Sequence, residues 1–192
     1  TLPEAVAVAY GFNPEGGTIN YRFSTYDDVS ELSTAIQMTK GFLRPEGSYF
    51  FRAESFFNVA TKAEDYRDFS SGPLMYGGRS LHGQSHGESF LAFFQTFSGR
   101  GLYIMDEPEA ALSPQRQLTL FIQIARMAEA GAQFIIATHS PILLGIPGAE
   151  ILSFDGGEVH PCEYEETESY QVTEMFINNR DTLTERLLRD GV

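Results

Sequence analysis

The chain has 192 residues, 42% of them hydrophobic, and a formal net charge of −13. This length supports one domain with a real core, and the composition excludes a disordered chain. The acidic surplus argues against a general nucleic-acid binder or a protein of anionic membrane surfaces, although acidity more often serves solubility.

Three further classes are disfavoured. No apolar run approaches the ~18 residues of a membrane-spanning helix, and no secretion signal opens the chain. Cys162 is the single cysteine, which excludes an internal disulfide and fits a reducing cytoplasm. A cytoplasmic protein without a membrane segment is therefore expected.

The first half of the chain predicts a mixture of short elements. Proline near the start of a short apolar run indicates a helix over 3–10, and a turn-rich loop follows it at 11–20. The remaining patterns predict strands at 21–24 and 48–53, helices at 29–39 and 55–66, and a Gly- and Ser-rich loop over 70–87.

The second half alternates more regularly. The expected order is a helix over 88–97, a strand at 102–106, a helix over 114–130 that stops at Gly131, a strand at 133–137, a short helix from Pro141, strands near 150–154 and 157–160, and helices near 170–178 and 181–189. Apolar strands without alternation that interleave with helices predict an α/β fold around a buried parallel sheet. No internal repeat is present.

Two carboxylates follow the strand at 102–106. Asp106 ends the apolar run and Glu107 comes next, before Pro108. Ligands of parallel sheets bind beyond the carboxyl ends of the strands, and neighbouring residues of a strand point opposite ways. One acid can hold Mg²⁺ through water while the other faces an attacking water. A solvated acid pair at a strand end is an equally good interpretation of these two residues alone.

A histidine follows the next strand. "FIIATHSP" ends in Thr138 and His139, and Ser140 with Pro141 predicts the N-cap and first turn of a helix. His139 is thus expected at the carboxyl edge of the sheet, where it can donate to a phosphate. A lone histidine here is more often structural, but two polar strand ends together favour a site.

A third stretch, "SHGES", precedes the apolar run of the helix at 88–97. Ser85 and Glu88 have the spacing of a capping box, and Gly87 lets a backbone come close. A helix N-terminus offers free N–H groups to an anion. A capped helix and an anion site are compatible interpretations.

These pieces, in this order, resemble the ATP-binding-cassette class of ATPases. "QSHGE" (84–88) resembles the signature motif, "LYIMDE" the Walker B strand, "EAALSP" the D-loop and "THS" the switch histidine. More closely, "GFNPEGG", "RAESFFNVA", "YGGRS" and "DEPEAALSPQRQ" are similar to compact stand-alone bacterial ATPases of the AAA family.

The resemblance implies a P-loop NTPase-like fold that binds ATP and Mg²⁺. Asp106 would organise the Mg²⁺ shell, Glu107 would act as general base, and His139 would contact the γ-phosphate. ATP would be sandwiched in a head-to-tail homodimer; the nucleotide contacts implied across and within subunits are Thr1, Ser85, His86, Gly87, Glu88 and Ser113. The chain would be a single ATPase domain that is incomplete at its N-terminus. Residues 1–84 would form the remainder of the nucleotide-binding lobe with a helical insertion, 85–160 would hold the signature, Walker B strand, D-loop and switch histidine, and 161–192 would form C-terminal helices.

Several positions depart from the family pattern. His86 stands where the signature has glycine, and Ser113 stands where the D-loop has aspartate. No glutamine follows the strand at 48–53, which leaves Glu54 as the candidate for the metal-sensing position.

The phosphate-cradling loop G-x-x-x-x-G-K-[ST] is absent, because neither lysine of the chain, Lys40 or Lys62, follows a glycine. The resemblance places Thr1 just after that Walker A loop. Without the loop and the strand before it, the 192 residues alone are expected to bind ATP weakly, and to self-associate or need a completing segment.

Two other functions stay open. A non-catalytic interaction module would show no hydrolysis under any condition. A DNA-repair or chromosome-associated ATPase would carry long coiled coils, and residues 1–84 hold no sustained heptads.

Overall fold

The computed structural model describes residues 1–19, 31–41, 45, 47–53, 90–92, 94–97 and 99–190. Contacts divide the chain into two compact units, Thr1–Thr138 and His139–Val192. The first unit holds a parallel sheet and the second is mainly helical, and each is described by itself.

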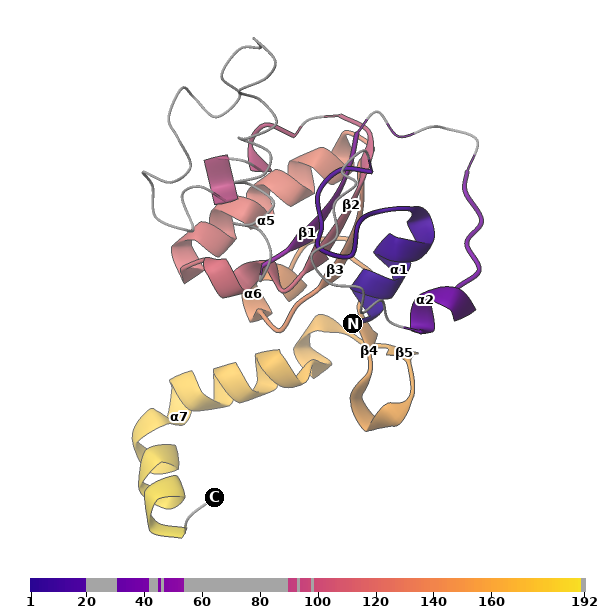
Figure 1. Cartoon of the computed structure of the whole chain (residues 1–192). Coiled ribbons are helices and arrows are strands. Elements are labelled where there is room, and N and C mark those ends of the chain that lie inside the picture. The colour runs from indigo at the N-terminus through magenta and orange to yellow at the C-terminus, as the bar shows by residue number, and fades with distance from the viewer. Residues whose placement is uncertain are drawn as a thin grey trace. The chain divides into compact units, whose positions relative to one another are not determined.

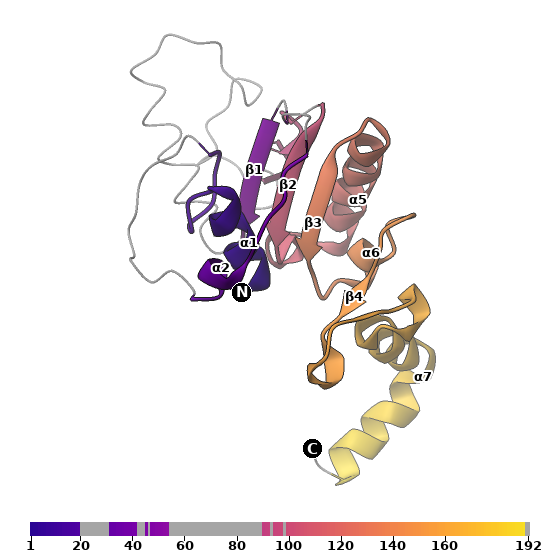
Figure 2. The same cartoon turned by 90° about the vertical axis from the view of Figure 1, so that its right-hand side faces the viewer.

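A three-stranded parallel sheet forms the centre of the first unit (Figure 2). Its strands are β1 (Gly47–Arg52), β2 (Gly101–Asp106) and β3 (Gln133–Ala137), in the order β1-β2-β3. Every residue of β2 is buried, which explains why its sequence is apolar without alternation. The predicted α/β fold with a buried parallel sheet is confirmed, and the three predicted strands match within one or two residues.

Helix α1 (Leu2–Tyr10) covers one face of the sheet (Figure 1). It confirms the helix predicted over 3–10. Its small side chain Ala7 lets Phe50 of β1 and Ile104 of β2 pack close beneath it, and all three are fully buried. Burying one such side chain contributes roughly 1.5–3 kcal/mol, so this face ties the beginning of the chain to the sheet.

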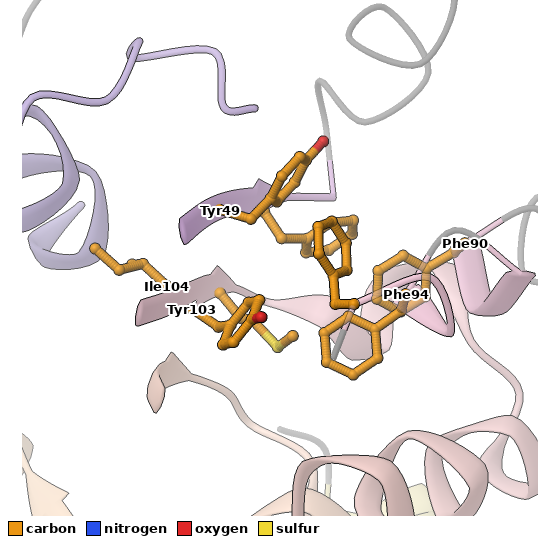
Figure 3. Close-up of a pocket in the computed structure, with 8 residues that line it drawn as sticks. Tyr49, Phe90, Phe94, Tyr103 and Ile104 are labelled. Carbon is orange, nitrogen blue, oxygen red and sulfur yellow. The ribbon is translucent and has the colours of Figure 1, made fainter. Parts of the chain in front are cut away.

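The opposite face carries α5 (Pro114–Glu129) (Figure 1). A layer of aromatic rings lies on the same face. Phe90 and Phe94 are both in helical conformation (Figure 3). The ring of Phe90 packs against Phe51 of β1, and that of Phe94 packs against Tyr103 of β2. The ring centroids of Phe94 and Tyr103 lie 6.4 Å apart, edge to face. The space among these rings has no room for a water molecule, so this pocket is core packing.

The end of α5 is set by Gly131, as predicted. Gly131 has φ +95°, its N–H donates to Ala128 O, and the next N–H, of Ala132, donates to Met127 O. This pair of bonds is a Schellman cap, which requires a left-handed residue and therefore favours glycine.

The helix predicted over 29–39 is wrong in extent. Within the described residues 31–41, only α2 (Leu32–Ala35) is helical, and Ile36 is extended at φ −80°, ψ 120°. Glu31 makes no side-chain cap, and the Thr34 hydroxyl donates to Glu31 O. A single uncapped turn does not offset the cost of helix nucleation. The elements predicted at 21–24, 55–66 and 70–87 lie outside the described residues.

The second unit begins with α6 (Pro141–Leu144). The predicted strands near 150–154 and 157–160 are short, β4 (Leu152–Ser153) and β5 (His160–Pro161), and they pair antiparallel with each other. They are thus separate from the parallel sheet.

Helix α7 (Glu168–Asp190) ends the described chain. It is interrupted at Asn179, whose φ of −132° and ψ of 27° are not helical, and whose side-chain amide donates to Met175 O. The two predicted helices, 170–178 and 181–189, are therefore present on either side of this residue. Among the described residues, none of the helices is long and apolar enough to cross a membrane.

Candidate functional site

The carboxyl ends of the three strands meet at one edge of the sheet. In the strand register, Arg52 of β1 lies beside Asp106 of β2, and Asp106 lies beside Ala137 of β3. This is the edge at which parallel sheets bind ligands, and it is where the sequence predicted the acid pair.

Asp106 is buried at this edge, with 7% of its surface exposed. Its Oδ2 accepts a 2.9 Å hydrogen bond from the Thr1 hydroxyl, although the two residues are 105 positions apart. The structure therefore brings together two predicted site residues, one assigned to the metal and one to the nucleotide. A buried carboxylate needs such partners, because an unpaired buried charge is costly.

Thr1 is held in place by the first turn of α1. It is the N-cap: its hydroxyl oxygen accepts from the backbone N–H of Glu4 at 3.3 Å, and the Glu4 side chain accepts from the backbone nitrogen of Thr1. This reciprocal pair is a capping box. The N-terminus of α1 is thus fixed against the end of β2.

Two charged residues of this site were not found from the sequence. Glu4 is 7% exposed, and Arg52 has its Nη1 3.4 Å from Glu4 Oε2 and its Nε 3.8 Å from Asp106 Oδ2. The T-x-x-E spacing at the start of α1 was a signal for Glu4. Nothing in the local pattern around Arg52 indicated that it would reach both acids.

Glu107 faces solvent beside the buried Asp106. Its backbone is left-handed, with φ 49° and ψ 53°. Among the described residues, it is the one non-glycine residue with a positive φ. Its N–H donates to Ala137 O at 2.9 Å and its carbonyl accepts from the Ala110 N–H. Such backbone strain costs on the order of 1 kcal/mol and concentrates at functional sites.

The different environments of the two acids were predicted, but the cause is partly different. The strand ends at Asp106, so alternation along β2 does not set the direction of Glu107. The left-handed turn at Glu107 sets that direction. Directly after it, the buried Pro108 begins the 3₁₀ helix η2 (Pro108–Ala111).

Ser113 lies between η2 and α5. It is exposed and extended, at φ −64° and ψ 157°, and is the N-cap of α5 without a side-chain capping bond. The neighbouring Leu112 is buried and anchors this loop.

His139 belongs to the second unit and is exposed. Along the chain it follows the end of β3 by two residues. Ser140 caps α6 as predicted, since its Oγ accepts from the N–H groups of Ile142 and Leu143. Five further predicted site residues lie outside the described residues: Glu54, Ser85, His86, Gly87 and Glu88.

The oxygen donors at the edge suit a hard divalent cation. In the described part of the chain, no group of three His, Cys, Asp or Glu side chains could enclose a metal. Mg²⁺ does not need one, because it keeps several waters and binds through one or two carboxylates plus substrate phosphates. The buried Asp106 with the Thr1 hydroxyl fits that role.

The second unit has an open cleft of about 530 Å³ between the segment from Leu144 to Ile151, which begins at the end of α6, and the segment from Pro161 to Glu166. No predicted site residue lines it. Cys162 does line it. Partial burial of the thiol raises its pKa, and the negative charges of Glu166, Asp155 and Glu163 raise it further. A thiol that resists ionisation is a poor nucleophile, so the cleft gives no support to cysteine chemistry.

Residues 84–145 match the family model described as "AAA domain, putative AbiEii toxin, Type IV TA system". No curated protein and no solved structure gives a match. The matched range contains β2, the acid pair, α5, β3 and His139. Together with the parallel sheet, it supports a P-loop NTPase-like fold and a nucleotide-binding function of the AAA ATPase type.

Proposed function

We propose that this chain is part of an ATPase of the ATP-binding-cassette class, in which ATP is hydrolysed between two head-to-tail copies. The observation that carries the proposal is the contrast at the end of β2. Asp106 is buried and takes the Thr1 hydroxyl, whereas the adjacent Glu107 is exposed on a strained turn.

In this proposal the two acids divide the work. Asp106 holds Mg²⁺ through water, and the metal, when bound, neutralises charge on the phosphate oxygens. Thr1 orients the Asp106 carboxylate by its hydrogen bond. Glu107, which is open to solvent, accepts a proton from the attacking water.

The remaining groups stabilise charge and position the nucleotide. His139 donates to the γ-phosphate, and Glu54 senses the metal. The residues from Ser85 to Glu88, which the resemblance assigns to the signature motif, contact the γ-phosphate bound by the other copy. Ser113, exposed on its loop, lies at the contact between copies. Such hydrolysis depends mainly on positioning and electrostatic stabilisation.

Steady-state ATP turnover of the native protein that carries this chain tests the proposal. Glu107→Gln removes the proton acceptor and is expected to lower turnover at least ~100-fold, the usual contribution of general base catalysis. Glu129→Gln is the matched control, because Glu129 is exposed at the end of α5. Unchanged turnover in Glu107→Gln, or no hydrolysis by the native protein under any condition, contradicts the proposal.

A further inference from the structure

Arg52 links the two buried carboxylates of the site. Its guanidinium lies 3.4 Å from Glu4 and 3.8 Å from Asp106, while 24% of its own side chain is exposed. Glu4, Asp106 and Arg52 together carry a net charge of −1. One cation thus serves two acids, and its side chain is accessible to water.

The contact to Asp106 is the looser of the two. Asp106 Oδ2 also accepts the 2.9 Å bond from Thr1, and Arg52 has a further contact of 3.5 Å from Nη1 to Pro14 O. The backbones of Arg52 and Asp106 are fixed side by side by the strand register. The guanidinium can therefore leave Asp106 by a small side-chain movement while it keeps Glu4 as its partner.

We propose that Arg52 is an internal counter-cation for Asp106, which Asp106 exchanges for Mg²⁺ when the nucleotide binds. This inference rests on the proposed function, because it takes Asp106 as the carboxylate of the metal site. Two cations beside one carboxylate repel each other, so the arginine opposes the metal. Glu4 receives Arg52 after the exchange, which avoids an unpaired buried charge.

The exchange predicts opposite effects on metal affinity for variants of Arg52 and of Glu4. Arg52→Gln removes the competing cation, so metal should bind more tightly. Glu4→Gln removes the acid that competes with Asp106 for Arg52, so metal should bind more weakly. A purely structural role for the Glu4–Arg52 pair predicts a loss of stability in both variants without opposite changes in metal affinity.

The experiment is a Mn²⁺ titration of the native protein, followed by the electron paramagnetic resonance signal of free Mn²⁺. It is done at saturating ADP, with an ADP-only blank. Arg52→Gln is expected to bind Mn²⁺ ~3- to 10-fold more tightly, and Glu4→Gln to bind it more weakly by a similar factor, as for charge pairs about 4 Å apart at a water-like effective dielectric constant of ~80, because Arg52 is partly exposed. Arg100→Gln, at an exposed arginine of the same unit, should match the native affinity.

Two additional variants complete the test. Arg52→Lys keeps the positive charge, so it should bind Mn²⁺ with nearly the native affinity. It replaces Arg52→Gln in the comparison if that variant does not fold. In the double variant, the effect of Glu4→Gln should shrink, because Glu4 acts through Arg52.

The outcomes separate the inference from the function on which it rests. Asp106→Asn should abolish the Mn²⁺ site. If it does so while Arg52→Gln binds like Arg100→Gln, the counter-cation role is wrong and the metal site stands. If Asp106→Asn binds Mn²⁺ normally, both the metal assignment and the counter-cation role fail.

Discussion

The sheet unit and the C-terminal unit are stabilised in different ways. In the sheet unit, groups far apart in sequence meet, as Thr1 and Asp106 do across 105 positions. In the C-terminal unit the bonds of α7 are local, such as Tyr170 to Glu174 and Asn179 to Met175. The proposed chemistry depends mainly on the first unit, where long-range packing holds charged groups in fixed positions.

Burial differs as strongly as bonding. Ile104 of β2 is fully buried, whereas Ile177 and Leu188 of α7 are 71% and 83% exposed. In the described part of the chain, the apolar residues of α7 form only a weak amphipathic stripe. This helix therefore gains little free energy from burial. Substitutions of similar chemistry should therefore have very different effects in the two units.

The largest difference is expected from a pair of truncations. Ile104→Ala leaves a cavity between α1 and the sheet and should lower the free energy of unfolding by ~2–5 kcal/mol. Leu188→Ala removes an exposed side chain and should change it by less than ~0.5 kcal/mol. Urea unfolding followed by circular dichroism and tyrosine fluorescence measures both, since the chain has no tryptophan. Equal losses would contradict the contrast between the units.

A smaller difference is expected between two helix caps. Ser140 Oγ accepts two backbone N–H groups at the start of α6, whereas Ser113 makes no side-chain cap on α5. Ser140→Ala should destabilise the protein by ~0.5–2 kcal/mol, and Ser113→Ala, as its control, by much less. Thermal unfolding and amide hydrogen exchange near Leu143 report the effect. A larger loss from Ser113→Ala would overturn this assignment of the caps.

The smallest effect at neutral pH involves Tyr103. Burial raises the pKa of its hydroxyl above the ordinary value of 10.0. The neutral hydroxyl therefore contributes stability that is present below pH 10 and is lost as pH rises through the raised pKa. Tyr103→Phe should behave like the native protein near pH 7 and lose less stability above pH 10. Parallel alkaline curves for both proteins would show that Tyr103 does not control this loss.

The sheet could be predicted because its signals are local. β2 is buried on both faces, so "LYIM" is apolar throughout, and β3 shows the same pattern in "QFIIA". The stop at Gly131 and the cap at Ser140 are single-residue signals with a direct backbone cause. Acidic residues after a buried strand then placed Asp106 and Glu107 at the sheet edge.

The rest of the site depends on tertiary contacts that no local pattern shows. Arg52 is simply the last residue of an apolar strand, and only the pairing of β1 with β2 places it beside Asp106. The left-handed turn at Glu107 follows from its fixed neighbours, since its N–H is held by Ala137 of the adjacent strand. The over-long helix predicted at 29–39 failed for the opposite reason, because a local pattern lacked the packing that extends a helix.

The most direct test of the division of labour between Asp106 and Glu107 is the amount of unhydrolysed ATP retained by the native protein and its two single variants. After incubation with Mg²⁺ and ATP, Glu107→Gln should retain ATP in a stable dimer, because binding persists while proton transfer is lost. Asp106→Asn should retain little and remain monomeric, because the metal is lost. If both variants retain the same amount of ATP, or if Glu107→Gln releases ADP at the native rate, the two acids do not divide the work in this way.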